Sequence, residues 1–284
     1  MMSWTVGRLK ISKIVEIESI GSSKFILPQA SDEAIREIPW LTPDFATPEG
    51  RLKLAIQSWI VETPTRKIVI DTCVGNDKQG RMLPAWNNLD KPYLQDMAAA
   101  GYPADSIDTV ICTHLHVDHV GWNTKLSDGK WVPTFTNARY VFGKREYDYW
   151  AGENAKTEVP PFADSVLPVV AANKAEIVGN DFAIGDHVRI LPTPGHTPGH
   201  VAFTLGRAKE DAVFCGDLMH SPLQLRYPEL SPKFDVDPAQ AAKTRRSFLE
   251  RYCETDTLCC TAHFPSPSAG KIRRKGNGFS CEMV

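Results

Sequence analysis

Histidine and aspartate gather in one short stretch of the chain, Thr113–Gly121, which reads THLHVDHVG. Three of the eight histidines, His114, His116 and His119, lie in this stretch together with Asp118. Neutral imidazoles and carboxylates are ligands that borderline divalent metals prefer, zinc above all. Burying these groups together without a cation would be unfavourable. The stretch therefore predicts a metal site.

The strand expected before this stretch suggests how the ligands are presented. Residues 107–113 are mostly apolar and predict a buried strand that runs directly into the histidines. Residues i and i+2 of an extended segment point the same way, so His114 and His116 can converge on one ion. The chain then turns into a helix, where Asp118 and His119 can present to a second point nearby. The spacing thus indicates ligands for two neighbouring metals.

Three further candidate ligands stand at the ends of apolar strands later in the chain. His196 lies in a turn rich in proline and glycine, Asp217 closes an apolar run, and His263 follows a third strand. A carboxylate that ends a buried strand is costly unless it is paired or binds a cation. Ligands at several strand ends are expected where one sheet edge carries a metal cluster. His187 and His200 are predicted to be structural.

The rest of the sequence alternates strands and helices. Period-two alternation at 9–20 predicts a half-buried strand, and 52–61 with 67–71 predict a hairpin. The clearest helix is expected at 238–252, with Pro238 in its first turn. Further strands are predicted at 107–113, 138–142, 175–178, 187–191, 200–205, 211–215 and 257–261, and helical segments at 89–100, 144–150 and 160–172. Because no linker or repeat divides residues 1–284, the simplest architecture is one α/β domain with two sheets and helices outside them.

Residues 22–50 stand apart because they are irregular, rich in proline and yet apolar. Such a segment indicates a surface loop or one wall of a binding pocket. It is too apolar for a free loop, so a homodimer contact is also predicted there. Apolar residues expected to line a substrate pocket are Phe25, Leu27, Trp40, Phe45, Trp86, Trp122 and Leu223.

Composition narrows the class of protein. The 284 residues are 42% hydrophobic and 23% charged, which is typical of a folded globular protein. Lys+Arg 32 against Asp+Glu 34 gives a net charge of −2, so no basic excess indicates nucleic-acid binding. No apolar stretch approaches the roughly 18–20 residues of a membrane-spanning helix, and the N-terminus lacks a signal-peptide pattern. Together with seven cysteines that form no C-x-x-C pair, these features predict a cytoplasmic protein.

Four segments resemble the ligand motifs of the metallo-β-lactamase superfamily: Thr113–Gly121, Thr193–His200, Gly216-Asp217 and Ala262-His263. The resemblance extends over residues 52–264 and implies a four-layer αββα sandwich with a dinuclear zinc site at one edge. It implies that Asp71, after an early strand, orients ligands. The implied ligands are His114, His116 and His196 for the first metal, Asp118, His119 and His263 for the second, and Asp217 as the bridge.

The C-terminal half, from the segment GDLMHSP at 216–222 onward, is similar to the lactonase and methyl-parathion-hydrolase-like branch of that superfamily. This resemblance implies a quorum-quenching enzyme that opens a small-molecule lactone, such as an N-acyl homoserine lactone, by attack of a metal-bridging hydroxide. Asp118 would pass a proton to the leaving alkoxide, and His220 would face the substrate.

Several alternatives stay open at this point. Phosphotriester, arylester or thioester hydrolysis could use the same site, and an iron-dependent oxidoreductase could use the same ligands. A catalytically silent binding scaffold is a further alternative. The basic cluster Lys271–Lys275 is interpreted as a solvated turn, not as a glutathione clamp.

Overall fold

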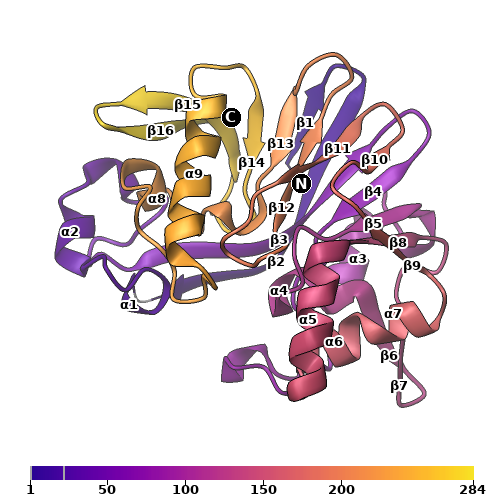
Figure 1. Cartoon of the computed structure of the whole chain (residues 1–284). Helices are drawn as coiled ribbons and strands as arrows, with labels where there is room; N and C mark the ends of the chain where they lie inside the picture. Colours follow the sequence, from indigo (N-terminus) through magenta and orange to yellow (C-terminus); the bar gives the residue numbers. More distant parts are fainter. Residues whose placement is uncertain (1, 22) are drawn as a thin grey trace. The chain divides into compact units, whose positions relative to one another are not determined.

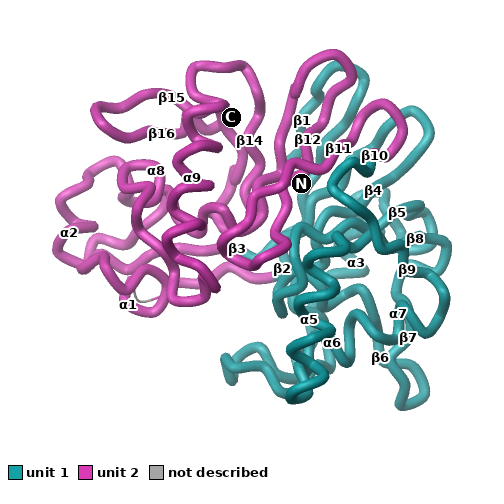
Figure 2. The backbone as a smooth tube through the Cα atoms, in the orientation of Figure 1, with its two compact units in different colours: residues 1–16, 56–182 teal, residues 17–55, 183–284 magenta. Residues whose placement is uncertain are grey.

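The computed structural model describes residues 2–21 and 23–284 (Figure 1). The chain divides into two compact units, shown in Figure 2: unit 1 holds residues 1–16 and 56–182, and unit 2 holds residues 17–55 and 183–284. No helix among the described residues has the length and apolar character needed to cross a membrane. The organisation as one domain stays a prediction.

Unit 1 is built on a seven-stranded sheet with the strand order β1-β2-β3-β4-β5-β8-β9, in which β2 and β3 continue into the residues of unit 2. From β4 to β9 neighbouring strands are parallel, so their carboxyl ends lie at the same edge. The stretch Thr113–Gly121 begins just beyond β5, at that edge. The strands are β1 (Ser3–Val6), β2 (Leu9–Gly21), β3 (Leu52–Glu62), β4 (Lys67–Ile70), β5 (Thr109–Ile111), β8 (Arg139–Gly143) and β9 (Ala175–Val178).

Helices and one small hairpin accompany this sheet. α5 packs against β8 and β9, and α7 packs against β7 of the hairpin. α4 is the short helix that carries Asp118 and His119. The elements are α3 (Tyr93–Ala99), α4 (Val117–Val120), α5 (Lys144–Lys156), α6 (Pro160–Ser165), α7 (Leu167–Ala171), η2 (Pro84–Trp86), η3 (Ala104–Ser106), η4 (Gly121–Asn123), β6 (Thr124–Ser127) and β7 (Lys130–Pro133).

Unit 2 contains a second seven-stranded sheet with the order β10-β11-β12-β13-β14-β15-β16. Its pairs are antiparallel except for β13 and β14, which are parallel. Helix α9 packs against β15 and η5, and its Phe248 and Leu249 enter a core formed with the sheet. The elements are β10 (Ala183–Ile184), β11 (Val188–Pro192), β12 (Val201–Leu205), β13 (Ala212–Phe214), η5 (Gly216–Leu218), α8 (Leu223–Arg226), α9 (Pro238–Tyr252), β14 (Leu258–Cys260), β15 (Ala269–Lys275) and β16 (Gly278–Met283).

The segment from 23 to 50 corrects the expectation of an irregular loop. It forms α1 (Ser23–Ile26), α2 (Asp32–Arg36) and η1 (Pro39–Leu41). Its apolar side chains, among them Leu27 and Leu41, are buried in a cluster of unit 2 that includes Leu223. Since these side chains are covered within the chain, they no longer argue for a dimer contact, and the homodimer stays an untested prediction. Residue 22 lies outside the described residues.

Two further expectations are wrong in detail. The alternation at 9–20 predicts a half-buried strand, yet Ile11–Ile14 of β2 are all buried. The buried Lys13 among them is accommodated by a hydrogen bond that it donates to Gln57 at 3.4 Å. The cluster Lys271–Lys275 is not a turn but part of β15. Its charges are accommodated at the surface, where Arg273 pairs with Glu282 of β16 at 3.0 Å.

Candidate metal centre

The histidines after β5 form a compact group within unit 1. His114 Nε2 lies 3.0 Å from His116 Nδ1, and the His114 and His119 ring centroids are 4.1 Å apart. His119 Nε2 lies 3.8 Å from Asp118 Oδ1. Donor atoms that share a tetrahedral zinc are about 3.3 Å apart, because each bond is about 2.0–2.1 Å long. The four predicted ligands of this stretch therefore lie at spacings suited to metal coordination.

Asp71, which directly follows β4, orients two of these histidines. Its Oδ2 lies 2.9 Å from His119 Nδ1 and accepts a hydrogen bond from Thr113 Oγ1 at 2.8 Å. Thr113 Oγ1 in turn lies 3.1 Å from His114 Nδ1. A carboxylate accepts only, so the two Nδ1 atoms carry the protons and the Nε2 lone pairs are left for a metal. The geometry agrees with the predicted orienting role of Asp71.

Two other buried carboxylates hold this stretch and the segments next to it. Glu146 of α5 accepts a hydrogen bond from Leu115 N at 3.1 Å. Glu16 of β2 accepts from Trp122 Nε1 at 2.6 Å and from Val74 N at 2.8 Å. Asp71 and Glu146 thus hold the ligand-bearing segment itself and Glu16 holds its neighbours, which restricts the positions of the imidazoles before any ligand arrives.

Replacing Asp71 with Asn should weaken zinc binding by about 10-fold to 100-fold, because the amide would place a donor against His119 Nδ1. The backbone should tolerate the change, since Asp71 has φ 56 and asparagine adopts that conformation readily. A chelator-competition titration measures the affinity. Asp96→Asn, on the exposed face of α3, is the matched control and should bind zinc as the wild type does. Equal affinities for both variants would remove Asp71 from this role.

A second group of histidines surrounds one carboxylate within unit 2. Asp217 Oδ1 lies 2.9 Å from His263 Nε2, while Oδ2 lies 3.2 Å from His196 Nε2 and 3.1 Å from His220 Nε2. The rings of His220 and His263 are stacked with centroids 4.9 Å apart. All four side chains are buried. Three imidazoles that converge on a buried carboxylate form a donor set of the kind that divalent metals bind.

The backbone around Asp217 explains why it reaches this position. β13 ends in the turn η5, where Gly216 has φ 51, a left-handed conformation that glycine adopts without strain. Asp217 N donates to His200 Nε2 at 3.0 Å, and His200 Nδ1 lies 2.8 Å from Thr193 Oγ1. His200 therefore supports the backbone of a candidate ligand, which agrees with the structural role predicted for it. His187 lies on the loop before β11, outside both groups.

Electrostatics in unit 2 favour a positive charge beside Asp217. Burial acts to lower the pKa of His196, but the hydrogen bonds and charges of Asp217 and Asp235 outweigh it and raise the pKa to about 9. Burial lowers the pKa of His220, which favours the neutral form of that ring. A bound cation would take the place of the proton on His196. The donor types, the spacing and this charge balance all fit a divalent metal.

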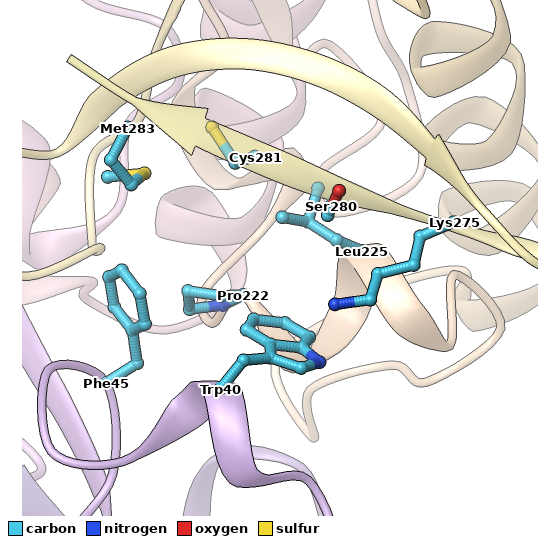
Figure 3. A pocket seen from close by; sticks show the side chains of 8 residues that line it. All are labelled: Trp40, Phe45, Pro222, Leu225, Lys275, Ser280, Cys281 and Met283. Atoms are coloured by element: carbon cyan, nitrogen blue, oxygen red, sulfur yellow. The ribbon is translucent and has the colours of Figure 1, made fainter.

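Unit 2 also contains a pocket of about 280 Å³, shown in Figure 3. Trp40 and Phe45 line it opposite Cys281 and Met283 of β16, and Lys275 lies with its Nζ 5.3 Å from the Trp40 ring. The other lining residues are Pro222, Leu225 and Ser280. The pocket is mainly apolar with one cation, and its part in substrate binding stays a prediction.

The remaining residues expected to line a pocket have other positions. Leu27 and Leu223 belong to the buried cluster of unit 2, and Trp122 is buried in unit 1, where it stacks on Tyr93 with ring centroids 5.2 Å apart. Phe25 packs against Phe234 at 5.5 Å between ring centroids. Trp86 lies in η2, half-buried.

Sequence patterns do not reveal three residues that support the candidate ligands: Glu16, Glu146 and Asp235. Each is a buried charged residue far along the chain from the group it holds. A periodic strand or helix pattern gives no sign of such a partner. The one available signal was the presence of a charged residue in a segment that is otherwise buried.

The sequence profile described as the metallo-beta-lactamase superfamily matches residues 52–263, which include all seven proposed metal ligands. The chain belongs to the metallo-beta-lactamase superfamily. This membership confirms the predicted family, the α/β fold class and a metal-dependent hydrolase.

Curated relatives of this superfamily member include N-acyl homoserine lactonases. Those of Bacillus cereus and Bacillus thuringiensis are 25% and 28% identical over 179 residues, which cover 59% of this chain and 64% of theirs. The match thus spans less than two thirds of the length of these relatives. A hydroxyacylglutathione hydrolase of Shewanella sp. (strain ANA-3) is 33% identical over 134 residues, covering 47% of this chain and 39% of its own.

Solved structures of the superfamily are similar over nearly the whole chain. The hydrolase AbOPH has a TM-score of 0.82 at 22% identity, with 99% of this chain and 96% of that chain covered. The dizinc quorum-quenching lactonase AidC, solved with a product, has a TM-score of 0.80 at 22% identity, with 100% and 97% covered. At this identity the likeness establishes the metallo-β-lactamase fold and leaves the substrate open.

Proposed function

We propose that this protein is a dinuclear zinc hydrolase that opens the ester of a lactone of the N-acyl homoserine type. The proposed ligands are His114, His116 and His196 for one metal, Asp118, His119 and His263 for the other, and Asp217 for both. The observation that carries the proposal is the spacing of donor atoms within each unit, 3.0 Å between His114 and His116 and 2.9–3.2 Å around Asp217. Superfamily membership and the names of the lactonase relatives support it.

The chemistry of the site divides between the metals and the chain. Two bound zinc ions would lower the pKa of a shared water towards neutrality and polarise the ester carbonyl. Asp118, beside His119 in α4, would carry the proton from that water to the leaving alkoxide oxygen. His220 lies with its Nε2 3.1 Å from Asp217 Oδ2 and would contact the substrate ester by hydrogen bonding. In a lactone the leaving oxygen stays tethered, so holding it in place matters more than expelling it.

A hydrolysis panel tests the proposal. Lactones of several acyl lengths, phosphotriesters, arylesters, thioesters and β-lactams are assayed with the zinc-loaded protein and with the chelated protein as the blank. Lactone opening that disappears on chelation and returns with zinc is the expected result. His116→Ala should lose this activity, whereas His187→Ala, the matched control outside both histidine groups, should keep it. Lactone opening that survives complete removal of metal would contradict the proposal.

Thioester hydrolysis is the second candidate, because the Shewanella relative is named a hydroxyacylglutathione hydrolase. Faster turnover of a glutathione thioester than of any lactone in the panel would favour it. An iron-dependent oxidoreductase would show a visible absorption band and redox activity from the same ligands. A colourless, redox-silent metal protein is expected here.

A further inference from the structure

A buried arginine lies behind the candidate ligands of unit 2. Arg245 of α9 has no exposed surface, and its Nε donates to Leu218 O at 2.5 Å. Its Nη1 donates to Pro228 O at 2.7 Å and to Leu230 O at 2.8 Å. A buried guanidinium is tolerated only when its donors are satisfied. Here the donors bind backbone carbonyl oxygens of the loop that follows Asp217. Arg245 thus fixes the course of that loop.

The same arginine lies next to a carboxylate that contacts a candidate ligand. Arg245 Nη2 is 3.5 Å from Asp235 Oδ2, and the side chain of Asp235 is fully buried. Asp235 Oδ1 lies 2.8 Å from His196 Nδ1. Because a carboxylate only accepts, His196 carries a proton on Nδ1 towards Asp235. Its Nε2 is the nitrogen turned towards Asp217, at 3.2 Å from Oδ2.

Backbone hydrogen bonds also link the turn that carries His196 to the residues just after Asp235. Val236 N donates to His196 O at 2.9 Å, and Asp237 N donates to Gly195 O at 3.0 Å. Asp237 then caps α9 by accepting from Gln240 N at 2.9 Å, so the helix that carries Arg245 starts directly beside the His196 turn. A side chain added at Gly195 would put its Cβ 2.3 Å from the backbone N of Ala241 in α9, which shows how closely the two segments pack.

We infer that Asp235 is a positioning residue for His196, and that Arg245 holds Asp235 and the loop after Asp217 in one arrangement. The inference rests on the proposed function, because it takes His196 as a metal ligand. Asp235 fixes the ring orientation and the tautomer that leave Nε2 free of a proton in the metal-loaded protein. Arg245 extends this control to Asp217 through the carbonyl of the next residue, Leu218. The pair therefore governs how tightly the metal shared by His196 is held.

Zinc affinity is the first readout. Competition with a chelator is measured for the wild type, Asp235→Asn and Asp235→Ala. Asp235→Asn should loosen one of the two metals by about 10-fold and Asp235→Ala by about 100-fold, while the other metal is unaffected. Dialysis against limiting chelator should then leave about one zinc per chain in Asp235→Ala and two in the wild type. Arg246→Gln, the next residue on α9 with a side chain 47% exposed, is the matched control and should keep both.

The tautomer of His196 in the metal-free protein is the second readout, and a merely structural role would not move it. Nitrogen NMR of the imidazole rings, recorded where the rings are neutral, should show His196 protonated on Nδ1 in the wild type, because Nδ1 lies 2.8 Å from Asp235 Oδ1. Asp235→Ala should shift that ring towards the Nε2–H form. Arg245→Lys keeps the positive charge but loses the planar guanidinium and its several donors. The zinc affinity of this variant should fall between those of the wild type and Asp235→Ala.

The outcomes separate the two proposals. A wild-type protein that binds no metal would contradict the proposed function. The tautomer measurement would then still test the pairing of Asp235 with His196. A wild type with two zincs and an Asp235→Ala variant that holds both equally tightly, with an unchanged His196 tautomer, would overturn the inference alone. Arg245 variants can fail to fold, so the zinc affinity and the His196 tautomer of the Asp235 variants decide whether the inference holds.

Discussion

Replacing Asp217 with alanine should reduce lactone opening by about 1,000-fold or more without unfolding the chain. Three histidine Nε2 atoms lie 2.9–3.2 Å from its carboxylate oxygens, so this side chain is the centre of the donor group in unit 2. Losing its buried polar contacts should cost about 1–3 kcal/mol of unfolding free energy. That is well below the roughly 5–15 kcal/mol stability of a folded protein.

Steady-state kinetics and a thermal melt together check this prediction. Asp217→Asn keeps the shape but not the charge, and it should lose activity as Asp217→Ala does if the carboxylate binds cations. Asp186→Ala is the control, because Asp186 lies in unit 2 with its side chain 64% exposed in an ion pair with Arg207. Activity above a tenth of the wild type in both Asp217 variants would rule out a bridging role.

Replacing Gly121 with alanine should destabilise unit 1 by about 3 kcal/mol or more. The added Cβ would lie 1.8 Å from Val74 O and 2.6 Å from Gly75 N, which are backbone atoms that cannot swing aside. Gly121 N also donates to Cys73 O at 2.8 Å, so the two backbones are already in contact. The substitution must push α4, with Asp118 and His119, away from the loop after β4.

A melting curve and a zinc titration measure the effect. The melting temperature should fall by about 6–12 °C, at about 2–4 °C per kcal/mol for a protein of this size class. Zinc affinity should fall as well. Gly152→Ala is the matched control, because Gly152 lies in α5 with nothing within 4 Å of its added Cβ and alanine favours helix. Equal melting temperatures for the two variants would show that the contact at Gly121 is not tight.

The ligand-bearing strand ends could be predicted because their signals are local. The stretch Thr113–Gly121 combines four metal-binding side chains with the buried strand before it, and the structure places β5 and α4 where that pattern indicates. Helix α9 follows the predicted bounds, 238–252, since Pro238 and the apolar spacing mark it clearly. Such elements can be predicted from local periodicity alone, because the pattern does not depend on which residues they contact.

Other features depend on contacts between distant residues and left no local signal. Asp235 and His196 are 39 positions apart, and Glu16 and Trp122 are 106 apart. Neither carboxylate differs in the sequence from a solvated one. The sequence does not predict β15, because Lys271 and Arg273 suggest a surface turn, whereas in the structure they pair with Asp256 and Glu282. The apolar character of 23–50 is evident in the sequence, but the cluster that buries these side chains with Leu223 depends on a contact with a distant segment.

Anomalous diffraction at the zinc absorption edge, from crystals of the protein as purified, tests the central claim most directly. Two zinc peaks per chain are expected, one bound by His114, His116 and His196 and the other by Asp118, His119 and His263, each in contact with Asp217. No anomalous peak, or metal bound away from these residues, would contradict the proposed function.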